Sequence, residues 1–338
     1  MKLYCGIDLH SNNSYIVIID ENDKIVAEKK VVNDLKAILA LLLPFRDSIC
    51  GVAVESTFNW YWLVDGLIEN DFSVHLVNTS KVKQYEGLKY SDDKYDSFWL
   101  AHLMRLEILP TGYIYPKEER AIRDLVRRRM QLVQQKTTHI LSIQNQIIRN
   151  TGIQVSANDV RKLNAQDIEG FLSDVNQRLA INSNLCIMHA LEKEVHHLEQ
   201  AAVKQVMLRE EYKLLLDISG IGKILALTIM LETGDISRFK HVGNYASYCR
   251  CVNSKLMSND KKKGKGNTKN GNKYLAWAYI EAANFAIRFN ENAKRYYQKK
   301  AAKTKRVIAL KAVAHKLSRA CYYVIKNQEP FNNDRIFI

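Results

Sequence analysis

The sequence predicts an α/β domain at the N-terminus followed by two mostly helical regions. From residue 3 to about 110, short β-rich runs alternate with amphipathic helical segments. After Pro116 the chain changes character, and residues 117–150 lack both Gly and Pro. With 338 residues, 47% of them hydrophobic, the chain can bury two or three cores rather than one.

The N-terminal elements follow one another in a recognisable order. Leu3–Asp8 and Tyr15–Asp20 read as a hairpin, because the turn-forming run Ser11–Ser14 separates them, and Lys24–Val32 alternates as a third strand. The next elements are a helix over Asp34–Leu43 that ends at Pro44, a strand over Ile49–Glu55, a helix over Trp60–Asn70, a strand over Phe72–Val77 and a helix from Asp93 onward. This order predicts a mixed sheet with helices on its faces, as in RNase H-like domains.

Four acidic residues are the candidate catalytic residues of this domain. Asp8 and Glu55 interrupt or end apolar β-type runs, where burying an unpaired carboxylate costs several kcal/mol. Asp93 and Asp96 share one helical face and repel each other. Both costs disappear if the four acids bind divalent cations, and two metals about 4 Å apart suit phosphodiester chemistry. We therefore predict a Mg²⁺ or Mn²⁺ site with His10 as a neighbour rather than a ligand; the alternative is four unrelated surface or capping acids.

The charge of the chain favours a polyanionic partner. Fifty Lys and Arg against 36 Asp and Glu give a net charge of +14, and neutralising phosphates releases counterions. Apolar runs stay well below the roughly 20 residues of a membrane-spanning helix, and the N-terminus enters a strand without a signal-peptide core. The six cysteines form no Cys-x-x-Cys pair and read as reduced core residues. We expect a cytoplasmic, nucleoid-associated protein that binds nucleic acid and no membrane.

The middle region, residues 116–209, is predicted to form a coiled-coil arm. It combines a long helix over 117–150 with a second one over about 168–208, each with a narrow apolar stripe. Such an arm predicts a homo-oligomer, a dimer or tetramer, that a charge at Leu191 or Val195 should dissociate. A helical bundle within one globule is the alternative.

The third region, residues 210–338, carries two candidate phosphate-binding segments. Ser219-Gly220-Ile221-Gly222-Lys223 opens an apolar helix and presents backbone N–H groups to an anion, unless the glycines serve only tight packing. The stretch Lys261–Lys273 has no acidic and no apolar side chain, so we expect it not to fold on its own and to contact phosphates; the alternative is a solvated loop. The predicted nucleic-acid-binding residues are Gly220, Gly222, Lys223, Lys261, Lys262, Lys263, Lys265, Lys269, Asn272 and Lys273.

These motifs together resemble a known family. Gly-Ile-Asp-Leu-His at 6–10, Val-Glu-Ser at 54–56 and Asp-Lys-Tyr-Asp at 93–96 resemble the DEDD motif of insertion-sequence transposases with a RuvC-like N-terminal domain. Ser-Gly-Ile-Gly at 219–222 and Lys-Asn-Gly-Asn-Lys-Tyr-Leu at 269–275 resemble their second domain. The resemblance implies a RuvC-like catalytic domain over 1–115 and a transposase that cuts and rejoins DNA. In some members a structured bridge RNA pairs with both DNA partners.

The resemblance also implies a serine nucleophile in the second domain. Ser258 stands at the matching position, Ser254 is the second choice, and the implied mechanism passes through a phosphoserine bond to DNA. The metal held by the acids would then assist the serine, in a composite site between domains or subunits. The departures from the family pattern are Asn253 for proline, Asn259 for glycine, Arg250-Cys251 for Gly-Leu and Ser97 for alanine.

Three other functions are alternatives to this one. A Holliday-junction-type nuclease would use the same acids to activate water, without a covalent intermediate. A non-catalytic nucleic-acid-binding protein would not depend on Asp8. An actin-like ATPase or sugar kinase needs further glycine-rich phosphate loops, which residues 1–210 do not offer.

Overall fold

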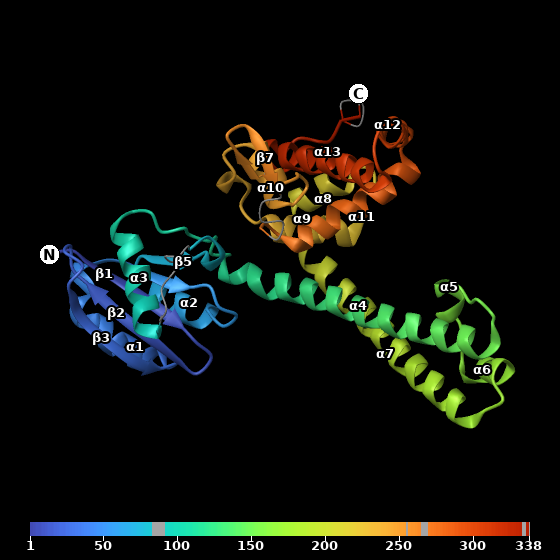
Figure 1. Ribbon diagram of the computed structural model, residues 1–338, viewed down its shortest axis with the longest axis horizontal. Helices are drawn as coiled ribbons and strands as arrows, with labels where there is room; N and C mark the ends of the chain where they lie inside the picture. The colour runs from blue at the N-terminus through green and yellow to red at the C-terminus, as the bar shows by residue number, and fades with distance from the viewer. Residues whose placement is uncertain (83–91, 255, 265–269, 333–335, 338) are drawn as a thin grey trace. The chain divides into compact units, whose positions relative to one another are not determined.

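The chain divides into two compact units, Met1–Lys117 and Glu118–Ile338, in a computed structural model (Figure 1). The structure describes residues 1–82, 92–254, 256–264, 270–332 and 336–337. The predicted three-way division at residues 115 and 209 stays a prediction. Among the helices that the structure describes, none combines the length and the apolar character needed to cross a membrane.

A five-stranded mixed sheet forms the centre of the first unit. Its strands are β1 (Leu3–Leu9), β2 (Asn13–Ile19), β3 (Ile25–Val32), β4 (Ile49–Glu55) and β5 (Val74–Val77), in the spatial order β3-β2-β1-β4-β5. β1, β2 and β3 are antiparallel neighbours, whereas β4 is parallel to both β1 and β5. The predicted mixed α/β sheet is confirmed, and its order is consistent with an RNase H-like fold.

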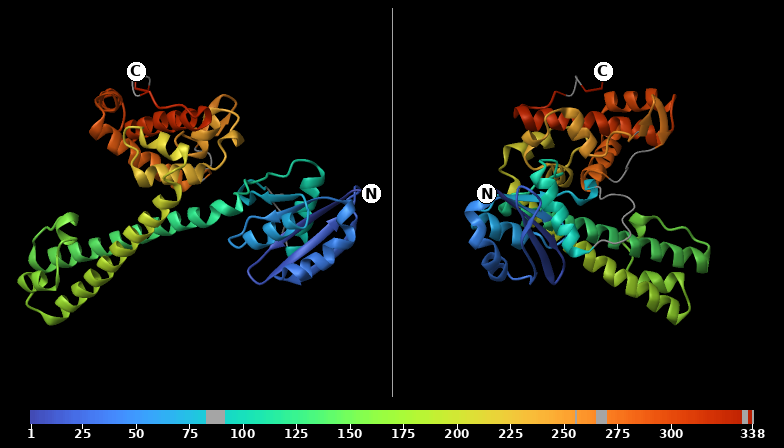
Figure 2. Two further views of the ribbon diagram at one scale, coloured as in Figure 1. Left: turned by 180° about the vertical axis from the view of Figure 1, so that it is seen from behind. Right: turned by 60° about the vertical axis from the view of Figure 1, so that its left-hand side comes forward.

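Helices cover both faces of this sheet (Figures 1 and 2). On one face, α1 (Leu35–Leu42) and α2 (Tyr61–Glu69) bury Ile38 and Leu63 against strand residues such as Ile7. On the other face, α3 (Asp93–Arg105) buries Ala101 against Val17 and Ile19 of β2. The carboxylate of Asp34 caps α1 by accepting a hydrogen bond from Ala37 N, and the 3₁₀ turn Leu43–Ser48, with Pro44, follows.

Gly6 lets α3 lie directly against the middle strand. A Cβ atom at this position would stand 2.0 Å from the carbonyl oxygen of Ser97 and 2.9 Å from the amide nitrogen of Ala101, both in the α3 backbone. Ser97 is fully buried, and its hydroxyl lies 2.9 Å from Tyr15 O of β2 and 2.7 Å from Asp93 O. The start of α3 therefore lies in direct backbone contact with the sheet.

Replacing Gly6 with alanine should push α3 off the sheet. We expect Gly6→Ala to lower the free energy of unfolding by about 1–3 kcal/mol, because the new methyl group meets backbone atoms that cannot rotate away. Urea unfolding measures the loss. Gly112→Ala is the matched control, since a Cβ there makes ordinary contact at 3.5 Å from Leu76 O. Equal stability of the two variants would contradict the close packing of α3.

Two long helices of the second unit lie side by side (Figures 1 and 2). They are α4 (Lys117–Thr151) and α7 (Val175–Val206), with the short helices α5 (Ala157–Val160) and α6 (Ala165–Phe171) between them in sequence. Arg129 pairs with Glu199, and Lys136 Nζ lies 2.9 Å from Glu192, each linking α4 to α7. Ile143 and Met188 are fully buried in the core that this pair shares with α5 and α6.

The predicted second helix over about 168–208 is wrong at its N-terminal end. α6 ends at Phe171, and α7 begins only at Val175, where the Asp174 carboxylate accepts a hydrogen bond from Gln177 N. Leu172 between them is extended, with φ −137° and ψ 131°. An aspartate that caps a new helix competes with the continuous helix that the apolar spacing favours. Val195 is only 6% exposed, so its side chain packs inside the arm.

The remaining helices form the C-terminal body. They are α8 (Glu210–Leu216), α9 (Lys223–Thr233), the 3₁₀ turn Ile236–Arg238, α10 (Val242–Tyr248), α11 (Lys273–Phe289), α12 (Glu291–Ala301) and α13 (Arg306–Asn327). Their core also contains Ile122 and Val126 of α4 and Ala202 and Val206 of α7. The base of the arm is therefore part of this core, and the predicted, mostly helical C-terminal region is confirmed.

A small hairpin interrupts these helices. β6 (Leu256–Ser258) pairs antiparallel with β7 (Lys261–Gly264), so the first four residues of the lysine stretch form a strand with a partner from outside the stretch. The two turn residues, Asn259 and Asp260, have φ values of 54° and 58°. Positive φ at both central positions is typical of a two-residue type I′ turn, which Asn and Asp tolerate. β6 supplies the backbone hydrogen-bonding partners that the lysine stretch lacks by itself.

Candidate active site

Asp8 and Glu55 meet at the carboxyl ends of two adjacent parallel strands. Ile7 of β1 is in register with Val54 of β4, which places the next residue of each strand side by side. Asp8 is only 3% exposed. Its burial, together with a hydrogen bond to Glu55 and the charge of that carboxyl group, raises the pKa of Asp8 to about 8. The pairing of β1 with β4 thus brings the carboxyl groups of Asp8 and Glu55 together where Asp8 is shielded from water.

Asp96 completes a hollow with these two acids. A cavity of about 270 Å³ is lined by Asp8, Glu55 and Asp96, together with Thr79, Val82, Trp99 and Leu100. Asp96 stands in the first turn of α3, whose start is fixed by the Asp92 carboxylate accepting a hydrogen bond from Tyr95 N. The close contact of α3 with Gly6 brings this turn over the end of β1.

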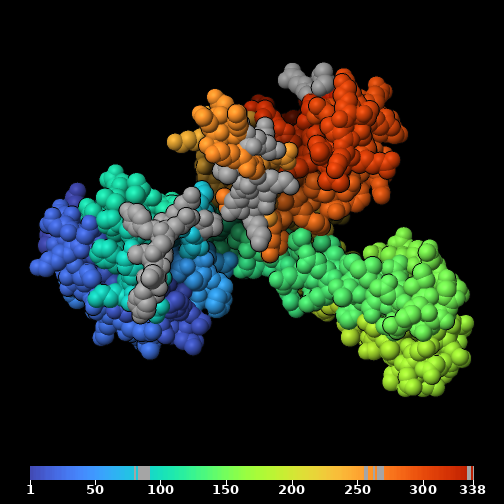
Figure 3. Space-filling view, viewed as in Figure 1, coloured from blue at the N-terminus to red at the C-terminus, as the bar shows by residue number. Residues whose placement is uncertain are grey.

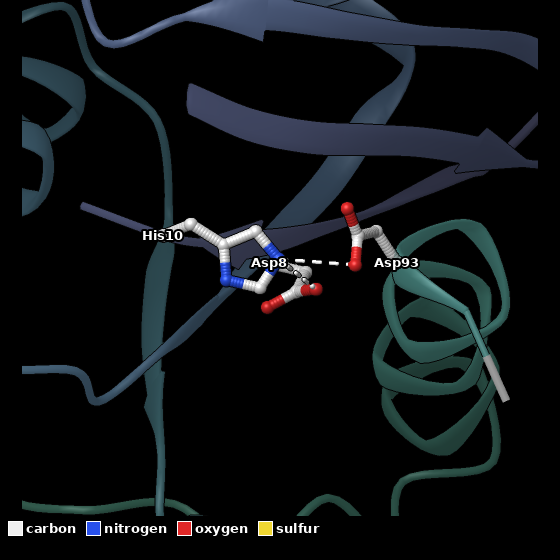
Figure 4. Close-up of side chains that lie close together, drawn as sticks. All are labelled: Asp8, His10 and Asp93. Carbon is white, nitrogen blue, oxygen red and sulfur yellow. Dashed lines mark ion pairs between the residues drawn. The ribbon is translucent and has the colours of Figure 1, made fainter. Parts of the chain in front are cut away.

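Asp93 reaches the same place through His10 (Figure 4). The His10 Nε2 atom lies 3.2 Å from Asp8 Oδ2 and 3.1 Å from Asp93 Oδ1. Lys30 Nζ lies 3.3 Å from the other oxygen of Asp93. Hydrogen bonds from His10 and then Lys30 lower the pKa of Asp93. The structure therefore brings all four predicted acids to one end of the sheet, with His10 and Lys30 on the Asp93 side.

His10 has a more central place than the sequence indicated. Its ring nitrogen and the carboxylate oxygens of Asp8 and Asp93 all lie within 4.8 Å of one another, as metal ligands do. Its carbonyl oxygen accepts hydrogen bonds from the side-chain amides of Asn33 and Asn59. The i, i+2 spacing of Asp8 and His10 was the available signal, because alternate strand residues share one face.

The donor set fits a divalent cation. Asp8, Glu55 and Asp96 offer only carboxylate oxygens, the ligands that Mg²⁺ and Mn²⁺ prefer. A cation would also stabilise the charged form of Asp8, whose pKa is raised first by burial and then by the neighbouring Glu55. The structure thus contains a candidate acidic metal site, which agrees with the oxygen chemistry predicted from the sequence.

The two glycines of the Gly-Ile-Gly turn differ: Gly220 packs closely against another helix, and Gly222 lies at the surface. Gly220 has φ 94°, and a Cβ there would lie 2.4 Å from Ala282 O, so this glycine serves close packing against α11. Gly222, by contrast, has no atom within 4 Å of its Cβ position, and it precedes α9 without a side-chain cap. Lys223 is exposed and lines a hollow of about 640 Å³ beside this turn.

Ser258 is exposed. It belongs to the C-terminal body, which is coloured from yellow to red in Figure 3. It is the last residue of β6, and Lys261 of β7 is its direct partner across the turn. Lys261, Lys263 and Lys273 are exposed, whereas Ser254 is half-buried. Lys265, Lys269 and the side chain of Lys262, which were also predicted to bind nucleic acid, lie outside the part of the chain that the structure describes.

Asn272 is placed differently from the predicted lysines. It is 8% exposed and caps α11, because its side-chain oxygen accepts hydrogen bonds from Tyr274 N and Leu275 N. Its amide nitrogen donates to Glu232 Oε2 at 2.6 Å. These contacts give the side chain a structural role, and the predicted phosphate contact of Asn272 stays a prediction.

Glu232 is a buried acid that the sequence did not single out. It is 2% exposed and binds Arg123 and Arg127 of α4 in addition to Asn272. Burial raises the pKa of Glu232, but the hydrogen bond from Arg127 and the charges of both arginines outweigh this and hold it below its usual value. Residues 127–129 are three consecutive arginines, and the first and last of them, Arg127 and Arg129, form ion pairs within the protein.

Comparison with protein families identifies the chain. Residues 5–149 match the IS110-type DEDD transposase model, described as a transposase, and residues 212–298 match the model of the transposase IS116/IS110/IS902 family. The chain belongs to the IS110-type DEDD transposases. No curated protein matches it at a significant level.

The two matches cover both candidate sites of this DNA transposase. The first includes all four acids at one end of the sheet, and the second includes the Gly-Ile-Gly turn and the hairpin with Ser258. The name of the first family model refers to a DEDD set of acidic residues, which agrees with four acids close together in a basic protein. A transposase acts on DNA, so the excess positive charge has a polyanionic partner.

Proposed function

We propose that this transposase cuts and rejoins the DNA strands of its mobile element through a covalent bond between Ser258 and DNA. A structured guide RNA selects the DNA partners, and Asp8, Glu55, Asp93 and Asp96 hold Mg²⁺ or Mn²⁺. The single observation that supports it best is the convergence of these acids at the ends of β1, β4 and α3.

The acids have separate tasks in this proposal. Asp8, Glu55 and Asp96 bind the cation from the walls of the cavity, while His10 and Lys30 orient Asp93. A bound divalent ion supplies charge stabilisation for the attacking and leaving oxygens of the phosphodiester. Asp8 is only 3% exposed, and poorly hydrated surroundings strengthen these electrostatic interactions.

Ser258 supplies the hydroxyl group that attacks phosphorus. The new serine–phosphate bond keeps one DNA end on the protein and releases the other end as a free hydroxyl group. Attack by a hydroxyl group from another strand then restores a DNA phosphodiester and frees the serine. Directly opposed residues of an antiparallel pair have Cβ atoms about 4.5–5.5 Å apart, so Lys261 can share the phosphate bound at Ser258.

A strand-exchange assay tests this function. The protein is mixed with DNA and RNA from the element's own locus, and the joined strands are measured by sequencing. We expect joined products with Mg²⁺ and none after chelation, because the acids act through the cation. Cleaved but never rejoined DNA would favour the nuclease alternative, and unaltered DNA would favour a binding protein.

Lys261 and Lys263 should differ in their effect on cleavage. Both lysines are exposed, but only Lys261 lies opposite Ser258. We expect each alanine variant to lower the slope of log K for DNA binding against log salt concentration by roughly one, because one phosphate contact is lost. Lys261→Ala should in addition slow cleavage about 100-fold, since a positioned donor for the reacting phosphate is lost. Equal cleavage rates for the two variants would contradict the role of Lys261.

An exposed apolar stripe of α7 is our candidate for self-association. Val175, Leu179 and Ile187 are 65%, 68% and 44% exposed, whereas Val195 is buried within the arm. The expectation that a charge at Val195 separates the subunits is therefore replaced: Val195→Asp should disrupt the arm itself.

The corresponding prediction concerns Leu179. We expect Leu179→Glu to weaken self-association more than about tenfold, the effect of 1.4 kcal/mol, while the thermal midpoint stays unchanged. Analytical ultracentrifugation measures both variants over a range of concentrations. A native protein that remains monomeric at high concentration, alone and with nucleic acid, would contradict this proposal.

A further inference from the structure

The chain before and the chain after the segment that carries Ser258 meet at one point of the C-terminal body. We call this point the neck; it consists of Tyr248, Arg250, Gly271 and Asn272. The backbone N–H of Asn272 donates to Tyr248 O at 2.6 Å, so the two chain ends touch. Gly271 has φ 91°, and a Cβ atom there would lie 2.4 Å from the same carbonyl oxygen, which leaves room only for glycine.

Arg250 closes the neck from the other side. Its Nε and one terminal guanidinium nitrogen both donate to Gly271 O, at 3.1 Å and 2.8 Å. The backbone of Arg250 is in the left-handed region, with φ 55°, a conformation that costs a residue with a side chain about 1 kcal/mol or more. The next residue, Cys251, is 6% exposed and donates its N–H to Ala246 O. The strained backbone of Arg250 thus places two guanidinium N–H groups against the carbonyl oxygen of Gly271.

The neck is anchored to the interior on its far side. Asn272 binds the buried Glu232, which is held in turn by Arg123 and Arg127 of α4. On the near side, Lys311 Nζ of α13 lies 3.2 Å from Asn253 Oδ1, at the start of the hairpin segment. The described chain on both sides of the hairpin is therefore held to the C-terminal body.

We propose that Arg250 is a positioning residue for Ser258: its guanidinium group closes the neck and so fixes where the hairpin presents the serine hydroxyl to DNA. This inference rests on the proposed function, because the serine must act on DNA for its position to matter. The physical reason is that a reacting atom displaced by 1 Å can lose about 100-fold in rate.

The first test examines the neck without any DNA. Arg250→Gly removes the guanidinium group while glycine accepts φ 55° without strain, so the variant keeps its fold. We expect trypsin to cleave after Lys261 and Lys263 about tenfold faster than in the native protein, with the thermal midpoint nearly unchanged. Gln328→Gly is the matched control, since Gln328 has φ 54° at the end of α13, where its side-chain amide donates to Ile325 O. If trypsin cleaves Arg250→Gly at the native rate, Arg250 does not hold the neck closed.

The second test measures chemistry. We expect Arg250→Gly to form the Ser258–DNA adduct at least about tenfold more slowly at saturating DNA, while the half-saturating DNA concentration stays the same. Arg250→Lys keeps the charge but has a single donor, and should recover only part of the rate. An unchanged adduct rate would overturn the positioning role. If the native protein forms no adduct on Ser258, the proposed function fails, whereas the proteolysis result still decides whether Arg250 holds the neck.

Discussion

Ser258→Ala should abolish strand exchange while leaving the protein folded and bound to DNA. The serine is exposed at the end of β6, so losing its hydroxyl group creates no buried cavity and breaks no core contact. A covalent mechanism cannot proceed without its nucleophile, and we expect less than about 10⁻³ of the native rate. Joined strands are counted by sequencing, and DNA binding by fluorescence anisotropy.

Ser254→Ala is the matched control for this experiment. Ser254 lies four residues before Ser258 and is half-buried, outside the paired residues of β6. We expect it to retain most of the native rate. Loss of exchange in Ser254→Ala together with native exchange in Ser258→Ala would move the nucleophile to position 254. Native exchange in both variants would remove the serine mechanism and favour water activated by the acids.

Asp8→Asn should eliminate cleavage without reducing stability. The amide keeps the size of the side chain but removes the charge that draws a divalent ion into the cavity shared with Glu55 and Asp96. We expect at least about a 100-fold loss of cleavage rate. Without divalent ions, the thermal midpoint should be equal to or above that of the native protein, because a buried carboxylate beside another one is relieved.

Asp47→Asn controls for the loss of one negative charge in the same unit, since Asp47 is exposed in the 3₁₀ turn before β4. It should change neither cleavage nor Mn²⁺ binding measured by calorimetry. The nonenzymatic alternative, a protein that only binds nucleic acid, requires that Asp8→Asn be silent in every activity assay. A fully active Asp8→Asn protein would therefore refute the proposed metal site.

Much of the fold could be predicted because its signals are local. β4 has the predicted bounds Ile49–Glu55, since a strand buried on both faces appears as an unbroken apolar run that ends at a polar residue. α4 spans Lys117–Thr151 against a predicted 117–150, because a long stretch without Gly or Pro and with steady spacing has few other solutions. The break before α7 was missed because Asp174 was read as a helical residue rather than as a cap.

The features that were missed depend on partners distant in sequence. β7 consists of Lys261–Gly264, a poor strand by composition, and forms because β6 and the Asn259-Asp260 turn provide its ladder. Asn272 was predicted to contact phosphate because its neighbours are basic, yet its side-chain amide donates a hydrogen bond to Glu232, 40 residues earlier. The place of His10 between Asp8 and Asp93 depends equally on how α3 packs on Gly6. Composition near a residue does not report such contacts.

The most direct measurement of the central claim is the mass of the protein–DNA adduct. A suicide DNA substrate, whose released end cannot return, traps the covalent intermediate, and peptide mass spectrometry locates the linkage. The proposed function predicts a single adduct on Ser258 that forms only with divalent ions and is absent in Asp8→Asn. Active strand exchange by the native protein without an adduct on any serine would contradict it.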